Sequence, residues 1–328
     1  MSDTLPEAFA VPDFDALLED YKAAAVDYVA EQDEDTASEL SEALDNDSEL
    51  LAQITQAFVL KRQSEIREQN YWARQMFRKY VTESDMIDLL ALQYNLQRQT
   101  ITAADTSVFP PTEAVMESDE SLLKRFDLAP YQFHTTGTRK GYKFHALTLG
   151  ERPVTTIETE DSGDVVMRFS FPDVTETLVK DAEVRMLTPN SGDVEVAILS
   201  RESDDGQASD ALLQSVSDYL NRDDIAQESD TITTKSATIT TYAIEATLYT
   251  GGDPAHAVTE ADAIAAVQEF ADQHHRLNQR VDRLELGNVL YGLNPLRVEL
   301  NAPAADVICD WDAAPYCTGV TIHVSAEQ

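Results

Sequence analysis

Basic residues are scarce in this chain, and the shortage limits the kinds of partner that it can bind. The 328 residues include 24 Lys and Arg against 60 Asp and Glu, which gives a formal net charge of −36. Nucleic-acid binding needs a basic surface that neutralises phosphates, and anionic lipid headgroups attract the same kind of surface. The composition therefore argues against nucleic acid and against a membrane surface as main partners.

Cysteine is equally rare, with Cys309 and Cys317 as the two thiols of the chain. Two thiols exclude a disulfide framework, and a structural zinc site needs about four convergent nitrogen or sulfur ligands. We interpret both as ordinary thiols near a strand, since a disulfide between them requires an environment outside a reducing cell. Long apolar runs are missing too: no run of about 18 residues predicts a transmembrane helix, and the acidic N-terminus does not resemble a signal peptide.

The acidic residues run through the whole sequence, and Lys is rarer than Arg, at 8 against 16. We predict adaptation to a high-salt environment, because the Debye length falls to about 3 Å at molar salt and self-repulsion is then screened. Folding or assembly is expected to fail below about 1 M salt. Thermal melting at low and at molar salt tests this expectation, and a Tm that does not change with salt would contradict it.

Helical patterns dominate the N-terminal part of the sequence. Asp13 precedes an amphipathic stretch at 15–30 and predicts a capped helix there. Residues 31–49 hold nine acids and indicate a solvated helix face or an exposed connector. The next stretch lacks Gly and Pro, which predicts a helix of about 30 residues over 48–80 and a second helix from 82 or 84 to about 97. A helix of that length needs a partner to cover its apolar stripe.

Six of the 24 basic residues lie between positions 61 and 79, interleaved with aromatic residues. In so acidic a protein, this basic segment (residues 61–79) is the best candidate for an interface with a partner. Pairing with the acidic first helix of the same chain is the alternative. The candidate interface residues are Lys61, Arg62, Arg67, Trp72, Arg74, Met76, Phe77 and Arg78.

Helices followed by strand–helix units make up the remainder, which predicts an α+β fold. Ser118 and Thr138 begin helical stretches that end at Pro130 and near Gly150. Alternating or β-branched segments predict strands at 154–160, 164–171, 183–188, 193–200, 231–250, 296–301 and 317–324, with helices at 205–224, 260–277 and 285–293. Two of the strand–helix pairs resemble each other, which indicates a weak internal repeat.

The sequence contains no motif for phosphate binding, zinc proteolysis or a serine nucleophile. His274 and His275 are helix neighbours that do not share a face, so we expect them at the surface near a helix C-terminus. Asp204, Asp205 and Gly206 lack the spacing of a calcium loop and indicate a strand-to-helix turn. We therefore predict no catalytic residue, no cofactor site and no metal site, and favour a binding or structural protein.

Arg139, Lys140 and Lys143 form a small cationic group on the helix predicted at 138–148, flanked by His134 and His145. Two explanations are open for this group. The side chains either form ion pairs with a partner or neutralise acids of the same chain.

Taken in order, these segments resemble the baseplate J-like family of contractile-tailed phages and related contractile injection systems. The resemblance begins with PDFDALLEDYKAA and the long helix ending in NYWARQMFRKY, and continues through RKGYKFHAL and GDVEVAILSRESDDGQASDALLQSVSDYLN. It closes with LRVELNAPAADVI and CTGVTIHV. Two features depart from the family: an insertion at 161–181, and an acidity that indicates a halophilic host or its virus.

The resemblance implies a structural, non-enzymatic role in a baseplate wedge, within a virion or tail particle. The implied partners are other copies of the chain, a smaller wedge protein often called protein I, a lysozyme-like wedge protein, the central hub and the sheath. The implied regions are an N-terminal helical region (1–99) in an intermolecular bundle, a connector with a helical segment (100–150), and a C-terminal α+β region (151–328). Trp72, Met76 and Phe77 are expected to be buried in that bundle, and wedge rearrangement is expected to transmit the switch to sheath contraction.

Two other functions are compatible with the sequence. One is an acidic α+β hydrolase of a halophile with an unrecognised active site, which would have a concave pocket with perturbed titratable groups. The other is an adaptor protein of a halophile with no phage origin. A neighbouring reading frame for a tail or sheath protein would favour the baseplate over both.

Overall fold

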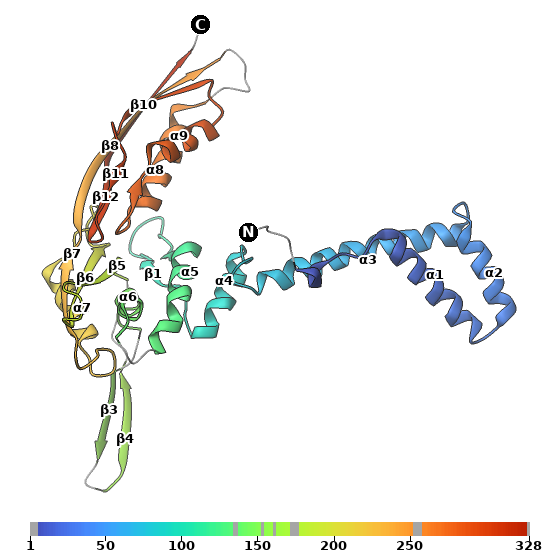
Figure 1. Ribbon diagram of the computed structural model, residues 1–328, viewed down its shortest axis with the longest axis horizontal. Helices are drawn as coiled ribbons and strands as arrows, with labels where there is room; N and C mark the ends of the chain where they lie inside the picture. Colours follow the sequence, from blue (N-terminus) through green and yellow to red (C-terminus); the bar gives the residue numbers. More distant parts are fainter. Residues whose placement is uncertain are drawn as a thin grey trace. The chain divides into compact units, whose positions relative to one another are not determined.

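The computed structural model describes residues 6–133, 137–151, 154–159, 162–170, 177–251 and 258–326 (Figure 1). The chain divides into two compact units, Met1–Gln93 and Tyr94–Gln328. The first unit is built of helices and the second combines strands with helices, so the predicted α+β fold is confirmed. Among the described residues, none of the helices has the length and hydrophobicity of a membrane-spanning segment.

The helical unit is built mainly from α1 (Phe14–Ala30), α2 (Glu34–Asp45) and α3 (Leu50–Gln75), preceded by a short 3₁₀ turn, η1 (Glu7–Phe9). Asp13 and Asp33 cap α1 and α2, because each carboxylate accepts a hydrogen bond from a backbone N–H two residues further on. α1 packs against both α2 and α3. The capped first helix is as predicted, and the acidic stretch after it forms a helix of its own.

α3 is shorter than predicted, because the chain leaves the helix after Gln75 and does not continue to Tyr80. The Gln75 side chain is buried, and its Oε1 accepts hydrogen bonds from the backbone N–H groups of Thr82 (2.7 Å) and Glu83 (3.2 Å). These contacts satisfy backbone donors at the start of α4 (Ser84–Ala91) and hold the turn between the two helices. The sequence pattern contained no signal for this side-chain contact.

α4 also ends earlier than the predicted limit near Gln97. A single 3₁₀ turn, η2 (Leu92–Tyr94), follows it, and Asn95 then adopts a φ of 57°. A residue in this left-handed conformation cannot continue a right-handed helix, and Asn is one of the few residue types that tolerate it.

The second unit begins with a short hairpin and two capped helices. β1 (Thr100–Thr102) pairs antiparallel with β2 (Val115–Met116), so the predicted connector contains a small sheet. α5 (Asp119–Leu128) and α6 (Arg139–Leu147) begin where the sequence predicted, and a 3₁₀ segment, η3 (Ala129–Phe133), follows α5. The caps are the predicted serine and threonine: their hydroxyl groups accept hydrogen bonds from backbone N–H groups three residues ahead.

The first three-stranded sheet has a buried central strand with one antiparallel and one parallel neighbour. β6 (Asp193–Ser200) pairs antiparallel with β5 (Val179–Met186) and parallel with β7 (Thr231–Ser236). α7 (Asp210–Leu220) forms the crossover between the two parallel strands and packs against β7. Crossovers between parallel strands commonly contain such a helix, so the strand–helix pattern of the sequence corresponds to a real βαβ unit.

The second three-stranded sheet repeats this arrangement, with a longer central strand and a longer parallel strand. β8 (Thr238–Thr250) lies in the middle, antiparallel to β10 (Arg297–Ala302) and parallel to β12 (Ala313–Ala326). α8 (Glu260–His274) and α9 (Arg283–Gly292) contribute to the main hydrophobic core, which includes Ile244, Leu248, Val267, Phe270, Leu286, Leu290 and Ile322. Each sheet therefore has a central strand that is followed by a helix and flanked by one parallel and one antiparallel strand, in agreement with the weak repeat in the sequence.

Short segments complete the second unit. β9 (Arg280–Val281) pairs with β11 (Val307–Ile308), and β7 continues almost directly into β8 through the buried Ala237. β3 (Val154–Thr159) pairs antiparallel with β4 (Val165–Ser170) in a separate hairpin (Figure 1). The insertion predicted at 161–181 overlaps β4 and the first residues of β5, whereas residues 161 and 171–176 lie outside the described part of the chain.

Candidate functional site

The structure places the candidate interface residues on two consecutive elements. Lys61, Arg62, Arg67, Trp72 and Arg74 lie on α3, and Met76, Phe77 and Arg78 lie in the turn that follows it. Trp72 is 48% exposed, and Met76 and Phe77 are more than half exposed. Among the described residues of the helical unit, none covers these side chains fully, so they are available to a partner.

The basic side chains of α3 make local contacts along their own helix. Lys61 Nζ and Arg62 Nη1 lie 3.8 Å and 3.6 Å from the carboxylate of Glu65, and Arg74 Nε donates to the carbonyl of Asn70 at 3.2 Å. These contacts do not reach the acids of α1, which was the alternative considered for the basic segment. Exposed pairs of this kind contribute little to stability, so their charges remain able to attract an acidic partner surface.

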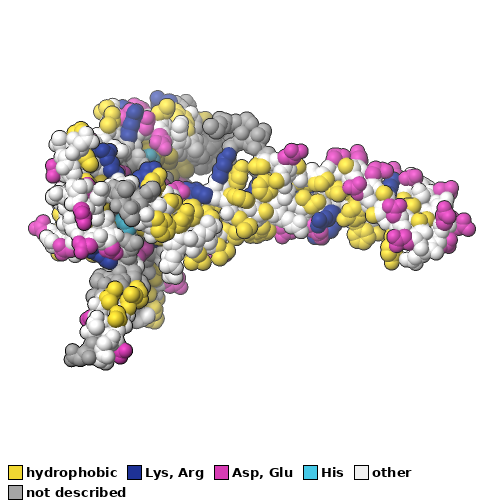
Figure 2. Space-filling view, turned by 60° about the horizontal axis from the view of Figure 1, so that its bottom comes forward, with side chains coloured by type: hydrophobic (Ala, Val, Ile, Leu, Met, Phe, Trp, Pro, Cys, Tyr) yellow, Lys and Arg dark blue, Asp and Glu magenta, His cyan; other side chains and the backbone are white. Residues whose placement is uncertain are grey.

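Several of the largest apolar side chains of α3 lie on its exposed face and not on the face that packs against the same chain. The face toward the same chain buries Ala52, Val59 and Gln63, and Gln63 Nε2 donates to the Pro12 carbonyl at 2.8 Å. The exposed positions carry larger apolar side chains, namely Leu50, Leu51, Ile54, Phe58 and Leu60. Hydrophobic side chains accordingly appear between the charged ones along the helical unit in Figure 2. This exposed apolar stripe is a candidate surface for interaction.

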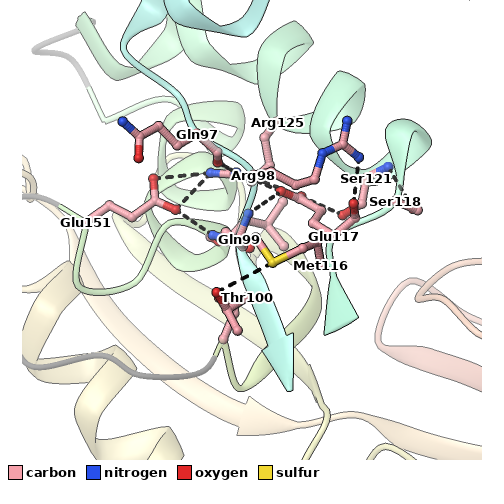
Figure 3. A network of polar contacts seen from close by, with 12 residues as sticks. Gln97, Arg98, Gln99, Thr100, Met116, Glu117, Ser118, Ser121, Arg125 and Glu151 are labelled. Carbon is pink, nitrogen blue, oxygen red and sulfur yellow. Dashed lines mark hydrogen bonds and ion pairs between the residues drawn. The ribbon is translucent and has the colours of Figure 1, made fainter. Parts of the chain in front are cut away.

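A buried ionic network lies in the second unit, around Arg125 of α5 (Figure 3). The Arg125 guanidinium makes a bidentate contact with Glu117, at 3.0 Å from Nε to Oε1 and 2.7 Å from Nη2 to Oε2. Its Nη1 donates to both oxygens of Glu151, at 2.8 Å and 3.1 Å, and its Nη2 also reaches the Gln97 carbonyl. The Gln99 N–H donates to Glu117 at 3.1 Å, so the network ties the β1–β2 hairpin to α5.

The electrostatics of this network are those of a structural element. The side chains of Arg125 and Glu117 are almost fully buried, and burial raises the pKa of Glu151 while the nearby guanidinium opposes that rise. Every donor direction of Arg125 is directed at an acceptor, which leaves no free group for substrate. Sequence reasoning missed the network, although a signal existed: Arg125 lies three positions from each of the buried residues Leu122 and Leu128 on the same face of α5.

The cationic group on α6 is explained in part by acids of the same chain. Lys143 pairs with Glu183 and lies 4.0 Å from Asp181, a buried carboxylate that also accepts from Lys124 Nζ at 2.6 Å. Lys140 instead donates to the Tyr131 hydroxyl at 3.0 Å. For Lys143 the explanation by neutralisation within the chain therefore holds; His134 lies outside the described residues.

His275 is buried, so its predicted position at the surface is wrong. It follows α8 and is 6% exposed, with Nε2 3.1 Å from the Asp205 carbonyl and Nδ1 2.9 Å from Lys180 Nζ. Since a carbonyl only accepts, Nε2 carries the proton and Nδ1 accepts from the Lys180 ammonium group. Burial, and then the Lys180 charge, lower the pKa of His275. His274 packs on Phe270 at the end of α8.

This pair leads to a pH prediction. Because the folded pKa of His275 lies below its unfolded value of about 6.5, its contribution to stability is complete above that pH and is lost as pH falls through the folded pKa. Protonation would bring a second cation beside Lys180, with Arg276 also near and Asp272 as the opposing acid. His275→Gln can keep both hydrogen bonds without titrating, so its Tm should fall less than that of the wild type between pH 7 and pH 5. Equal Tm losses in the two proteins would contradict this assignment.

The other candidate sites of the sequence are unremarkable in the structure. Asp205 accepts from the backbone N–H of Gln207 at 3.1 Å and from Ser203, as expected for a turn between β6 and α7. Cys309 and Cys317 are free thiols, and burial raises the pKa of both. Within the described ranges, no group of three or more His, Cys, Asp or Glu side chains is arranged to hold a metal ion.

These features define an α+β protein whose candidate site is an exposed apolar and basic stretch of a long helix. Over 313 residues the chain is 27% identical to baseplate protein J of Escherichia phage P2, which covers 95% of this chain and 93% of that protein. No protein-family model matches the chain. The similarity confirms the resemblance to the baseplate J-like family that the sequence predicted.

Proposed function

We propose that the protein is a structural component of a phage-type baseplate, at the end of a contractile tail. The observation that carries this proposal is the similarity to baseplate protein J along nearly the full length of both chains. A relation that spans both units supports a shared overall role more strongly than a match to one segment would. The expected location is a virion or tail particle.

The finer proposal assigns the protein to the baseplate wedge. The helical unit contributes α3 and the turn after it to an intermolecular helix bundle, in which Trp72, Met76 and Phe77 are anchors. The exposed apolar side chains of α3 support this assignment, since a helix that exposes its large apolar residues gains stability when a partner helix covers them. The proposed partner in the bundle is a smaller wedge protein of the protein I type.

The remaining partners are proposed from the resemblance. They are other copies of the chain, a lysozyme-like wedge protein, the central hub and the sheath, with the region 151–328 making contacts between copies. Transmission of the contraction switch requires interfaces with two discrete arrangements. The proposed role is non-enzymatic and uses no cofactor.

Mass spectrometry of purified tail particles, kept at high salt, tests the proposed function. We expect peptides of this chain at a constant small-integer ratio to the sheath and tube proteins, and the ratio would give the copy number. If the protein is absent from particles and stays alone in the cytoplasmic fraction, the proposed function is wrong.

A further inference from the structure

The short segment between α8 and β9 connects the two three-stranded sheets of the second unit. We call this segment, residues 275–278, the latch. The N–H of Leu277 donates to Asp181 Oδ2 on β5 at 3.3 Å, and the N–H of Asn278 donates to the carbonyl of Ala313 on β12 at 2.9 Å. The latch therefore contacts one strand of each sheet.

The side chain of Leu277 fills the apolar junction between the two sheets. It is buried and packs in a cluster with Leu199 of β6, and Trp311 packs on this cluster from a partly buried position. The other buried members of the cluster are the alanines Ala197, Ala237 and Ala314. Because alanine side chains fill little volume, the packing of the junction depends on Leu277 and therefore on the position of the latch.

His275 fixes the latch against the first sheet. Its Nδ1 accepts a hydrogen bond from the Lys180 ammonium group of β5, and its Nε2 donates to the Asp205 carbonyl in the turn after β6. This turn fits closely around the latch: Gly206 has a φ of 88°, and a Cβ at this position would lie 3.1 Å from His275 Nε2 and collide with Leu199. The latch is therefore held by shape as well as by hydrogen bonds.

Charged and aromatic groups face His275 from each element around it. The nearest cation is Lys180, whereas the acids Asp205 and Asp272 favour the protonated imidazole. Burial and the Lys180 charge outweigh these acids, so the pKa of His275 lies below its ordinary value. The other groups are Arg201 and Arg276, which act on Lys180, Glu120, which pairs with Arg276, Asp181, which accepts from the latch, and the Tyr316 ring of β12, 5.4 Å from the imidazole. The contacts of the latch are therefore those of a neutral His275.

Protonation of His275 changes what the latch can bind. An imidazolium has two N–H donors and no acceptor, so Nδ1 would face the ammonium group of Lys180 without a lone pair between them. The hydrogen bond would be replaced by repulsion between two cations that lie close together. An outward movement of the latch relieves this repulsion, and the same movement withdraws Leu277 from the junction.

We propose that the latch is a pH-sensitive switch: protonation of His275 opens the junction between the two sheets, while each sheet stays folded. The sheets remain connected because β7 continues into β8 and because Lys235 Nζ lies 2.6 Å from Asp312 Oδ2, outside the latch. The strand pairings within each sheet do not include the latch, so its movement leaves them in place. This inference concerns the chain by itself and does not depend on the proposed function.

The fluorescence of Trp311 tests the switch, because this ring packs on the junction. Trp72→Phe removes the other of the two tryptophans, so the full-length variant reports on Trp311 alone. Its emission and its circular dichroism are followed between pH 7 and pH 4, at a salt concentration at which the chain is folded. His275→Gln, added to this variant, removes the titrating group. His274→Gln is the matched control, because His274 is the neighbouring residue and its Nε2 lies 3.4 Å from Glu285, outside the latch.

We expect a red shift of the Trp311 emission with a midpoint below about pH 6.5, at unchanged circular dichroism, in the Trp72→Phe chain and in its His274→Gln form. The His275→Gln form should lack this shift. Carboxylates and the remaining histidines titrate in all three proteins, so their effects cancel in the comparison. An equal shift in the His275→Gln form, the absence of any shift, or a shift that coincides with loss of circular dichroism would each overturn the proposal.

Discussion

Replacing Arg125 by Ala is expected to lower the free energy of unfolding by about 3–5 kcal/mol. The substitution removes the cation that holds Glu117, whose side chain is 0% exposed, and leaves that carboxylate buried without a compensating charge. It also removes both bonds to Glu151 and the bond to the Gln97 carbonyl. Urea unfolding of the second unit, followed by circular dichroism, measures the change.

Two controls separate the buried network from ion pairs in general. Arg280→Ala breaks exposed pairs with Asp306 and Asp282 and should cost much less stability than Arg125→Ala. The double variant Arg125→Met with Glu117→Gln removes both charges of the central pair and should be more stable than Arg125→Ala alone, because no isolated charge is left in the interior. A loss from Arg125→Ala no larger than that from Arg280→Ala would contradict the structural role assigned to the network.

The parts of the fold that local chemistry determines could be predicted from the sequence. Asp13, Ser118, Thr138 and Ser209 each precede an amphipathic stretch, and each caps the helix that follows it. The strand segments after Gly150 were also recognisable, because β-branched residues and alternation mark them. Caps and strand alternation involve residues only a few positions apart, so they can be recognised in the sequence itself.

The parts that depend on contacts between distant residues could not be predicted. Gln75 ends α3 through bonds to Thr82 and Glu83, and an amide side chain in a helical pattern carries no sign of that role. His275 is buried because it meets Lys180, which lies 95 positions away in the sequence. An argument from helix faces considers only the helix that a residue belongs to. It therefore assigned His275 to the surface, although residues of other elements cover it.

The candidate interface could also be predicted only in part. The clustering of basic and aromatic residues at 61–79 was visible in the sequence, and their exposure agrees with a surface role. Which face of α3 remains open was not visible, because it depends on how α1 and α2 pack against the helix that buries Ala52 and Val59. The partner that covers the open face is a matter for experiment, and the most sensitive position to test is Trp72.

If Trp72 is an anchor worth about 2 kcal/mol, Trp72→Ala is expected to weaken binding of the helical unit to the proposed wedge partner by about 30-fold or more. Trp72 packs edge-to-face on Tyr71 at 5.2 Å and is half exposed, so removing it should leave the fold of the helical unit intact. Gln69→Ala, an exposed polar position of the same helix, is the matched control and should bind as the wild type does. Co-expression with the smaller wedge protein, followed by size-exclusion chromatography, measures complex formation, and circular dichroism checks that the helix content is unchanged. Normal complex formation by Trp72→Ala would remove α3 as the anchoring surface, and the search would then move to the exposed apolar residues of the second unit.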